Sequence, residues 1–262
     1  MPGTILTEIR TAPETGRVAW VTIDHSARLN TLNPGLMREF AAVMASVSAD
    51  EALQAVVLTG AGPKAFVGGA DIGVMAGIED ATAAAEFITL VHGCCRAVRD
   101  CPAPVIARVN GWTLGAGLEL AAACDLRLAA GHAQFGMPEV RVGIPSVVEA
   151  ALLPGLIGWG RTRRLLLLGE TIGAAEALDW GLVEKVVPAD MLDAAVAEWL
   201  GHLGAAGCRA LRLQKALMRQ WEDLPTGQAI AAGIPAFASA WSSEEPRRMM
   251  RAFVDRPRHR QG

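Results

Sequence analysis

The chain has 262 residues, of which 52% are hydrophobic and 19% are charged, and its formal net charge is -3. This composition predicts a globular protein with a sizeable core, and the weak net charge gives no reason to expect a nucleic-acid partner. No stretch reaches the roughly 18 uninterrupted apolar residues of a membrane-spanning helix, and the N-terminus lacks the pattern of a signal peptide, so we expect a cytoplasmic protein with no membrane partner.

The first part of the chain alternates β-branched segments with helical ones, which predicts α/β layering and not a helical bundle. Strands are expected at residues 5–9 and 17–23, followed by a helix from Pro34 to about Ala49 and a buried strand at 55–58. A second cycle has a helix at about 82–99, a strand at 105–109, a glycine-rich turn and a helix that begins near Gly115.

After about Ala189 the pattern changes to helices alone, which are expected at residues 191–203, 208–221 and 227–241. We therefore expect a core at residues 1–195 and a helical region at residues 196–262. The large apolar side chains of this region indicate contact between subunits, with a second small core as the alternative. These side chains are Met218, Trp221, Ile230, Phe237, Trp241, Met249, Met250 and Phe253.

Neither the cysteines nor the histidines form a metal or redox motif. The five cysteines include no C-x-x-C pair and are odd in number, as expected of reduced packing residues inside a cell. The five histidines lack H-E-x-x-H spacing, so we expect no bound metal. Three C-terminal arginines, Arg256, Arg258 and Arg260, are too few for a nucleic-acid surface and are expected in a solvated tail.

Two segments of small residues stand where a strand gives way to a helix, at 65–72 and 110–117, and they allow a ligand to approach the backbone closely. A dinucleotide site is disfavoured because Leu120 stands where the third glycine of its fingerprint belongs. The alternative is an anion hole, in which backbone N–H groups of two turns meet on one oxygen. The Ala116 N–H, at the start of a helix, is a donor without a helical partner, and Glu119 follows on the same side.

Two glutamates, Glu119 and Glu139, stand alone among apolar or conformationally special neighbours. A buried unpaired carboxylate is costly, so Glu119 indicates function about as strongly as it indicates a first-turn glutamate favoured by the helix dipole. Taken alone, Glu139 is more simply a strand-surface residue paired with Arg141 on the same face. Asp71 is more simply a helix cap than a catalyst.

Taken together, these segments resemble the crotonase superfamily of enoyl-CoA hydratases and isomerases over nearly the whole chain, and its enoyl-CoA hydratases most of all. Five motifs in the order of the family carry the likeness, and their number makes coincidence implausible. They are D-H-S-A-R-L-N-T-L-N at 24–33, K-A-F-V-G-G-A-D-I at 64–72, N-G-W-T-L-G-A-G-L-E-L-A-A-A-C-D at 110–125, F-G-M-P-E at 135–139 and G-E-T-I-G-A-A-E-A-L-D-W-G-L-V at 169–183.

The resemblance implies an α/β fold of ββα repeats wound into a spiral, a C-terminal helical trimerisation region, and a homotrimer or dimer of trimers. It implies that the backbone N–H groups of Ala70 and Ala116 form the oxyanion hole for the thioester carbonyl of an acyl-CoA. Glu119 and Glu139 then become the acid/base pair that adds water across a 2-trans-enoyl-CoA. We assign Glu119 to the water that attacks C3 and Glu139 to the proton delivered to C2.

Coenzyme A enters as part of the substrate, and no permanently bound cofactor is expected. The resemblance places Arg28 and the backbone of Lys64 and Ala65 near its phosphates and adenine. Asp71 and Ile72 complete the expected binding set, with Ile72 beside the bound arm.

The segment after Glu139 departs from the hydratase pattern, because the usual glycine-rich stretch is replaced by Ser146-Val147-Val148-Glu149-Ala150-Ala151-Leu152-Leu153. Ser146 is expected to take over the holding of water, while Val147 and Val148 narrow or reshape the acyl pocket. Glu149 is a third carboxylate, expected to point outward from its helix, with altered chemistry as the alternative.

Other functions remain open on the residues alone: a Δ3,Δ2-enoyl-CoA isomerase, an acyl-CoA hydrolase, and a catalytically inactive binding or scaffold homologue. An isomerase needs one carboxylate to move a proton, so the presence of both glutamates favours hydration. The residues do not indicate the acyl group.

Overall fold

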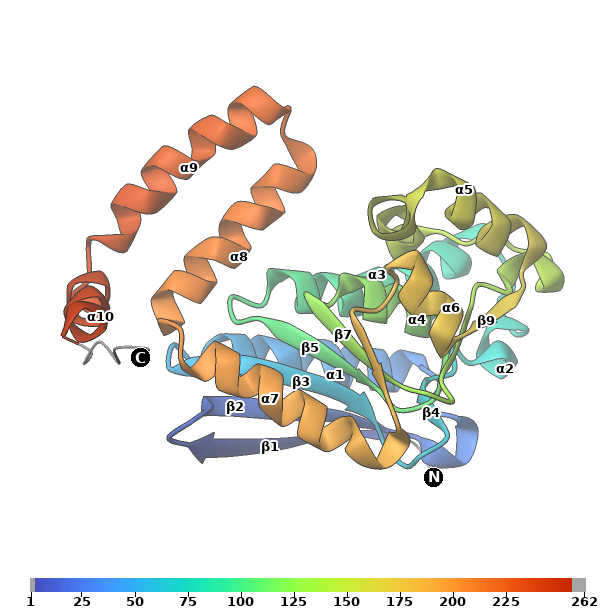
Figure 1. Ribbon diagram of the computed structural model, residues 1–262. Helices are drawn as coiled ribbons and strands as arrows, with labels where there is room; N and C mark the ends of the chain where they lie inside the picture. The colour runs from blue at the N-terminus through green and yellow to red at the C-terminus, as the bar shows by residue number, and fades with distance from the viewer. Residues whose placement is uncertain (1–2, 256–262) are drawn as a thin grey trace.

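A six-stranded sheet forms the base of the computed structural model, which describes residues 3–255 (Figure 1). Its order is β1-β2-β3-β5-β7-β10, with β1 antiparallel to β2 and the other neighbours parallel. The strands are β1 (Thr4–Ala12), β2 (Gly16–Asp24), β3 (Leu53–Gly60), β5 (Val105–Val109), β7 (Leu126–Ala130) and β10 (Lys185–Val187). All eight residues of β3 are buried, as expected of a central strand covered on both faces.

A second sheet of four short strands, in the order β4-β6-β8-β9, continues from the ends of the first. Its strands are β4 (Ala65–Val67), β6 (Trp112–Leu114), β8 (Gln134–Gly136) and β9 (Thr171–Gly173). The chain repeatedly enters the large sheet, then the small one, then a helix, as it does through β5, β6 and α4 (Ala116–Ala123). This repetition confirms the predicted spiral of ββα units.

Helices cover both faces of the large sheet. On one face, α1 (Pro34–Ser48), α3 (Ala81–Asp100) and α4 pack over the larger apolar core. On the other face lies α7 (Leu192–Gly204), whose Leu192 and Val196 belong to a second apolar cluster with Val57 and Ile106 of the sheet (Figure 1). The expected boundary between the core at residues 1–195 and the helical region at residues 196–262 falls inside α7. That division remains a prediction.

Short elements surround the edge of the small sheet and position the candidate site. They are α2 (Ile72–Met75), α5 (Leu153–Leu168), α6 (Ala174–Trp180) and the 3-10 helices η1 (Ser26–Arg28), η2 (Glu139–Val142), η3 (Val148–Leu152) and η4 (Ala189–Met191). The helices and strands expected from the sequence are confirmed, and the strand at 105–109 has the bounds that were predicted. None of the 3-10 helices was predicted.

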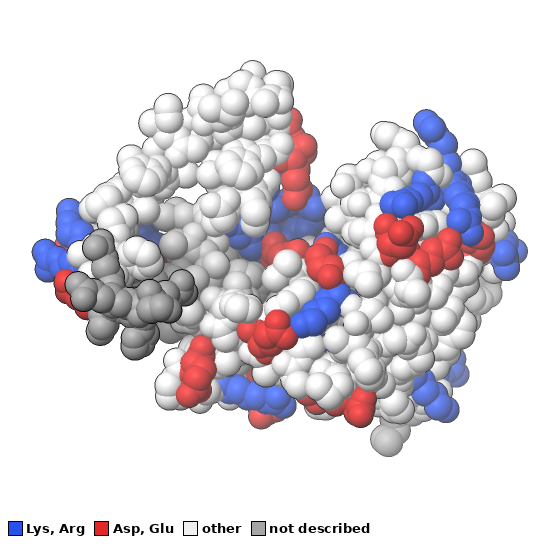
Figure 2. Space-filling view, viewed as in Figure 1, with Lys and Arg blue, Asp and Glu red and all other residues white. Residues whose placement is uncertain are grey.

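The C-terminal helices α8 (Cys208–Asp223), α9 (Thr226–Ala240) and α10 (Glu245–Val254) form an arch that stands away from the sheets (Figure 1). Lys215 ties α8 to the body through an ion pair with Asp125 at 2.6 Å. By contrast, α9 has no charged residue and buries none of its side chains, so its surface is uncharged (Figure 2). Arg256, Arg258 and Arg260 lie outside the described residues.

Four of the five cysteines are buried, which confirms the prediction of packing residues for those four. All five are free thiols, and Cys94, Cys95, Cys101 and Cys124 are buried. Burial raises the pKa values of Cys94, Cys95 and Cys124, so these thiols stay neutral. Within residues 3–255, no helix is long and apolar enough to cross a membrane.

Candidate active site

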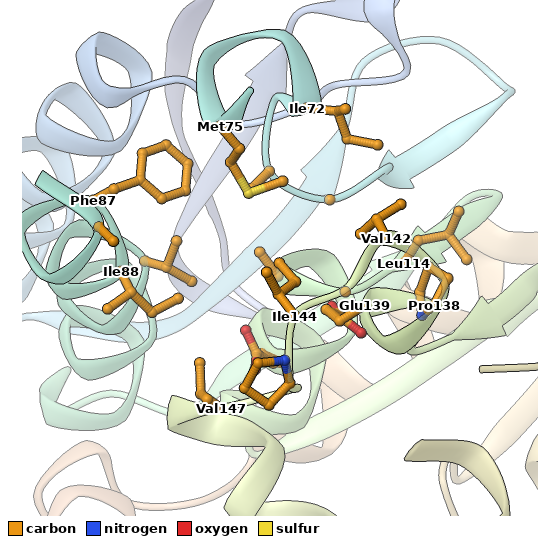
Figure 3. Close-up of a pocket in the computed structure, with 18 of the residues that line it drawn as sticks. Ile72, Met75, Phe87, Ile88, Leu114, Pro138, Glu139, Val142, Ile144 and Val147 are labelled. Atoms are coloured by element: carbon orange, nitrogen blue, oxygen red, sulfur yellow. The ribbon is translucent and has the colours of Figure 1, made fainter. Parts of the chain in front are cut away.

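A pocket of about 620 Å3 opens between α2, α3, the start of α4 and the segment after β8. Figure 3 shows Glu139 on one side of this pocket, with Met75, Phe87 and Ile88 across from it. The lining is apolar except for two carboxyl groups, those of Glu119 and Glu139. It consists of Gly68, Gly69, Ala70, Ile72, Met75, Ile78, Ala84, Ala85, Phe87, Ile88, Val91, Leu114, Gly115, Ala116, Glu119, Pro138, Glu139, Val142, Ile144, Pro145 and Val147.

The turn at Ala70 leaves one backbone donor directed away from its neighbouring strand. The Leu32 N–H donates to the Gly69 carbonyl, and the Asp71 N–H donates to the Leu32 carbonyl, each at 2.9 Å. Because successive groups of an extended chain point to opposite sides, the Ala70 N–H between them faces away from Leu32. Asp71 is the N-cap of α2 and accepts from the Gly73 N–H at 2.9 Å, which confirms the capping prediction.

The start of α4 supplies the second donor. Ala116 is the first helical residue, so its N–H has no partner within the helix, and it lines the pocket beside Ala70. Two glycines make the close approach possible. A Cβ on Gly117 would lie 2.0 Å from the Val67 carbonyl oxygen, and Gly115, at φ +50°, leaves room for the Glu139 carboxylate, which a Cβ would approach to 2.4 Å.

Glu119 is buried inside α4, with 4% of its surface exposed. Its pKa is raised to about 8, first by burial and then by the nearby charge of Glu139, with a smaller contribution from Glu149. The Ala150 N–H acts in the opposite direction and lowers the pKa, although its main hydrogen bond goes to the Val147 carbonyl at 2.9 Å. At neutral pH this buried environment therefore keeps the Glu119 carboxyl protonated.

Glu139 opens η2 directly after Pro138 and faces the pocket (Figure 3). The alternative of a strand-surface residue paired with Arg141 is wrong, because the Arg141 guanidinium donates to the Leu168 carbonyl instead. The Ser146 hydroxyl donates to Glu139 Oε2 at 2.8 Å and so fixes the orientation of this carboxyl group. The structure thus joins Ser146 to Glu139, and the expected role of Ser146 in holding water stays a prediction.

Glu149 does not point outward from its helix, as we expected from the sequence. Its side chain is only 8% exposed, and Oε1 lies 2.8 Å from His92 Nδ1 on α3. The sequence around Glu149 does not indicate this direction. The residue lies on η3, a short 3-10 helix, and its partner His92 lies on α3.

The residues expected to contact coenzyme A divide into two groups. Arg28 and Ile72 are exposed, Ile72 lines the pocket, and Arg28 lies 3.7 Å from Asp71. Lys64 and Ala65 do not line the pocket. The Lys64 carbonyl accepts from the Trp112 N–H at 3.0 Å, which fixes the path of the backbone there.

Two buried asparagines support the turns and were not predicted as site residues, although both stand in the quoted motifs. Asn30 and Asn110 each donate a side-chain N–H to the Ala65 carbonyl, at 2.8 and 3.0 Å. Asn110 also donates to the Gly60 carbonyl at 2.9 Å. These bonds join the end of β3 and the start of β4 to the residue that follows β5. Across the described residues, no group of three or more histidine, cysteine, aspartate or glutamate side chains has a metal-binding arrangement.

Comparison with known proteins gives a consistent family. The family described as Enoyl-CoA hydratase/isomerase matches residues 14–261. A crotonyl-CoA hydratase of Syntrophomonas wolfei is 35% identical, and a short-chain-enoyl-CoA hydratase of Clostridium acetobutylicum is 36% identical, each over 92% of both chains. Among solved structures, an enoyl-CoA hydratase of Mycobacterium smegmatis superposes with a TM-score of 0.92 at 26% identity over 98% of both chains. Another, from Bacillus anthracis, reaches 0.89 at 29% identity, over 95% of this chain and 96% of that one.

Proposed function

The chain belongs to the enoyl-CoA hydratase/isomerase family, and we propose that it is an enoyl-CoA hydratase that converts 2-trans-enoyl-CoA to 3-hydroxyacyl-CoA. One observation carries this proposal: two carboxyl groups, and no other polar side chains, line an apolar pocket beside two backbone donors. Addition of water requires a base and an acid together, and the pocket contains both.

In this proposal the thioester oxygen lies between the Ala70 and Ala116 N–H groups. Attack at C3 pushes electron density onto that oxygen, and two fixed donors stabilise the resulting enolate. Loss of one such donor typically costs roughly 3 kcal/mol of transition-state stabilisation. The N-terminus of α4 adds its partial positive charge at the same point.

The two carboxyl groups share one proton. The assignment of Glu119 to water and Glu139 to C2 requires that the proton lie on Glu139 when water attacks. Burial, followed by the charge of Glu139, favours the proton on Glu119, because together they raise the pKa of this carboxyl to about 8. These arrangements differ by the transfer of one proton, which a water hydrogen-bonded to both carboxyl groups can carry.

Short-chain enoyl groups are the substrates we propose, on the basis of the crotonyl-CoA and short-chain hydratases among the relatives. We also propose that coenzyme A enters past Ile72 at the mouth of the pocket, with Arg28 toward its phosphates. The five free thiols fit a reducing cytoplasmic location.

We propose a homotrimer, or a dimer of trimers, built through the C-terminal arch. Ile230, Ile234 and Phe237 repeat at helical spacing along α9 and are 71%, 74% and 68% exposed in the single chain. An apolar stripe of this kind is typical of a subunit contact. The mass of the particle in solution tests this part of the proposal.

The function is tested with purified protein on a panel of 2-trans-enoyl-CoA thioesters. Hydration removes the ultraviolet absorbance of the enoyl thioester and adds one water to the product mass, isomerisation adds no mass, and hydrolysis releases free thiol. Glu119→Gln and Glu139→Gln are each expected to lower kcat by about 10²- to 10⁴-fold. Unchanged turnover in both variants would refute the hydratase assignment.

A further inference from the structure

The strongest unexplained feature near the pocket is the buried Glu149, which stands where the family's glycine-rich stretch is interrupted. Its carboxylate contacts His92 through Oε1, at 2.8 Å. Its other oxygen, Oε2, is shut off from solvent and has no donor among the described residues. Among the described residues, His92 is thus the hydrogen-bonding partner of the Glu149 carboxylate. A buried charge is retained only where such a partner compensates it.

The short helix η3, which carries Glu149, packs directly against α4, which carries Glu119. η3 packs against α3, α4 and α5, and its Ala150 N–H interacts with the Glu119 carboxylate. Just before Glu149, Val148 has φ +40°, a left-handed conformation that is unfavourable for a β-branched residue. Such a conformation persists only when surrounding contacts impose it, and the His92–Glu149 contact is one that spans from η3 to α3.

We propose that Glu149, held by His92, is a positioning residue for Glu119: it fixes the η3 turn against α4 and so orients the Glu119 carboxyl toward the reacting water. This inference rests on the proposed hydration reaction. His92 takes part in this positioning through its contact with Glu149. Its side chain is 44% exposed, so a substitution there can test the contact without opening the core.

The charge of Glu149 gives the inference a second, independent consequence, since it raises the pKa of Glu119. Apart from Glu149, the charge that raises the pKa of Glu119 is that of Glu139. Glu139 acts on Glu119 from η2, and the Cys94 and Cys95 thiols of α3 are neutral because burial raises their pKa values. The charged residues of α5 are three arginines that contact groups other than Glu119. Arg161 pairs with Asp179, Arg163 lies over the Trp159 ring, and Arg164 pairs with Glu170 and Glu176.

The experiment compares wild type, Glu149→Gln, His92→Asn and the double variant in hydration of crotonyl-CoA. Glu149→Gln keeps the shape of the side chain and removes its charge. We expect kcat to fall about 10- to 100-fold in this variant, with KM changed less than about threefold, as for a displaced catalytic group. Because both residues act through one contact, the double variant should match the more affected single variant and not the product of the two.

A pH series separates positioning from a merely structural role. Removing the charge of Glu149 should move the basic limb of the kcat/KM profile to lower pH, because Glu119 then loses its proton more easily. The matched control is Glu198→Gln, on the outer face of α7 and paired with Lys185 at 2.7 Å, which should change neither kcat nor the limb.

The outcomes distinguish the two proposals. If wild type hydrates crotonyl-CoA while Glu149→Gln retains kcat within about twofold and an unmoved limb, the role of Glu149 is refuted and hydration stands. If wild type does not hydrate any enoyl-CoA, the proposed function fails. Urea unfolding without substrate then tests the coupling of Glu149 to Glu119. Between about pH 4.5 and 8, the free energy of unfolding must fall less steeply in Glu149→Gln than in wild type, and an equal fall refutes the coupling.

Discussion

Burial of Glu119 makes the stability of the folded chain depend on pH in a direction opposite to that of most carboxylates. Its pKa rises from the ordinary 4.5 to about 8, because burial and the neighbouring Glu139 charge disfavour ionisation. Between these values the folded chain keeps a proton that the unfolded chain has lost. Its contribution is therefore fully present below pH 4.5 and is lost as the pH rises toward about 8.

The size of this effect follows from the two pKa values. Each pH unit between them corresponds to about 1.4 kcal/mol, so the full difference amounts to about 5 kcal/mol. Water entering the open pocket reduces the penalty of the charged form, and a measured change of about 3 to 5 kcal/mol is expected. That is a substantial part of the stability of a typical folded protein.

Glu119→Gln removes the titrating group and keeps its shape, so the variant should lack this decline. We expect it to be more stable than wild type at pH 9 by about 3 to 5 kcal/mol relative to their difference at pH 5. Urea unfolding at a series of pH values and one fixed protein concentration measures the difference, since subunit association also affects apparent stability.

Glu198→Gln is the matched control for a glutamate without burial. The Lys185 hydrogen bond lowers the pKa of Glu198, so its effect on stability is confined to pH values below the ordinary 4.5. If the difference between wild type and Glu119→Gln stays within about 1 kcal/mol from pH 5 to pH 9, Glu119 is ionised in the pocket and the reasoning is refuted.

Further predictions concern the contacts around the carboxyl pair. Gly115→Ala should lower kcat about 100-fold, because the added Cβ would lie 2.4 Å from Glu139 Oε1 and displace that carboxyl group. The circular dichroism spectrum should stay unchanged, and activity near wild type would contradict this geometry. Ser146→Ala loses the hydroxyl donor to Glu139, and kcat should fall about tenfold, while Ser146→Thr should retain most of it. For wild type, kcat/KM should decline above about pH 8 as the pair loses its shared proton, and a profile flat to about pH 10 would exclude that proton.

The regular elements were predictable because each has a local signal. The strand at 105–109 is a short segment, apolar except for Arg108, bounded by Pro104 and Asn110, and the helix after Asn33 begins with a cap and a proline at its first position. The Asn33 side chain indeed accepts from the Leu36 N–H at 3.0 Å. Such signals involve neighbours in sequence, so no knowledge of the rest of the chain is needed.

The orientation of the carboxyl groups was not predictable in this way. Glu139 and Glu149 both lie on 3-10 helices, which have no extended apolar period, and their partners Ser146 and His92 are set by the path of other elements. The charge of Glu149 was visible in the sequence, but its direction depends on α3, more than fifty residues earlier in the chain. Local pattern therefore identified the residues and left their directions undetermined.

The altered segment from Ser146 to Leu153 connects these observations. Where relatives of this family were expected to supply glycine backbone, this chain supplies side chains, and three of them have distinct positions. Ser146 donates to Glu139, Val147 lines the pocket, and Glu149 contacts His92 behind Glu119. Backbone freedom is thus exchanged for a side-chain hydrogen bond to Glu139 and for a contact that joins η3, beside Glu119, to α3, with a strained Val148 between Ser146 and Glu149. A site anchored in this way depends on residues that a glycine-rich segment does not have, so its sensitivity to changes at Ser146 and Glu149 should be specific to this chain.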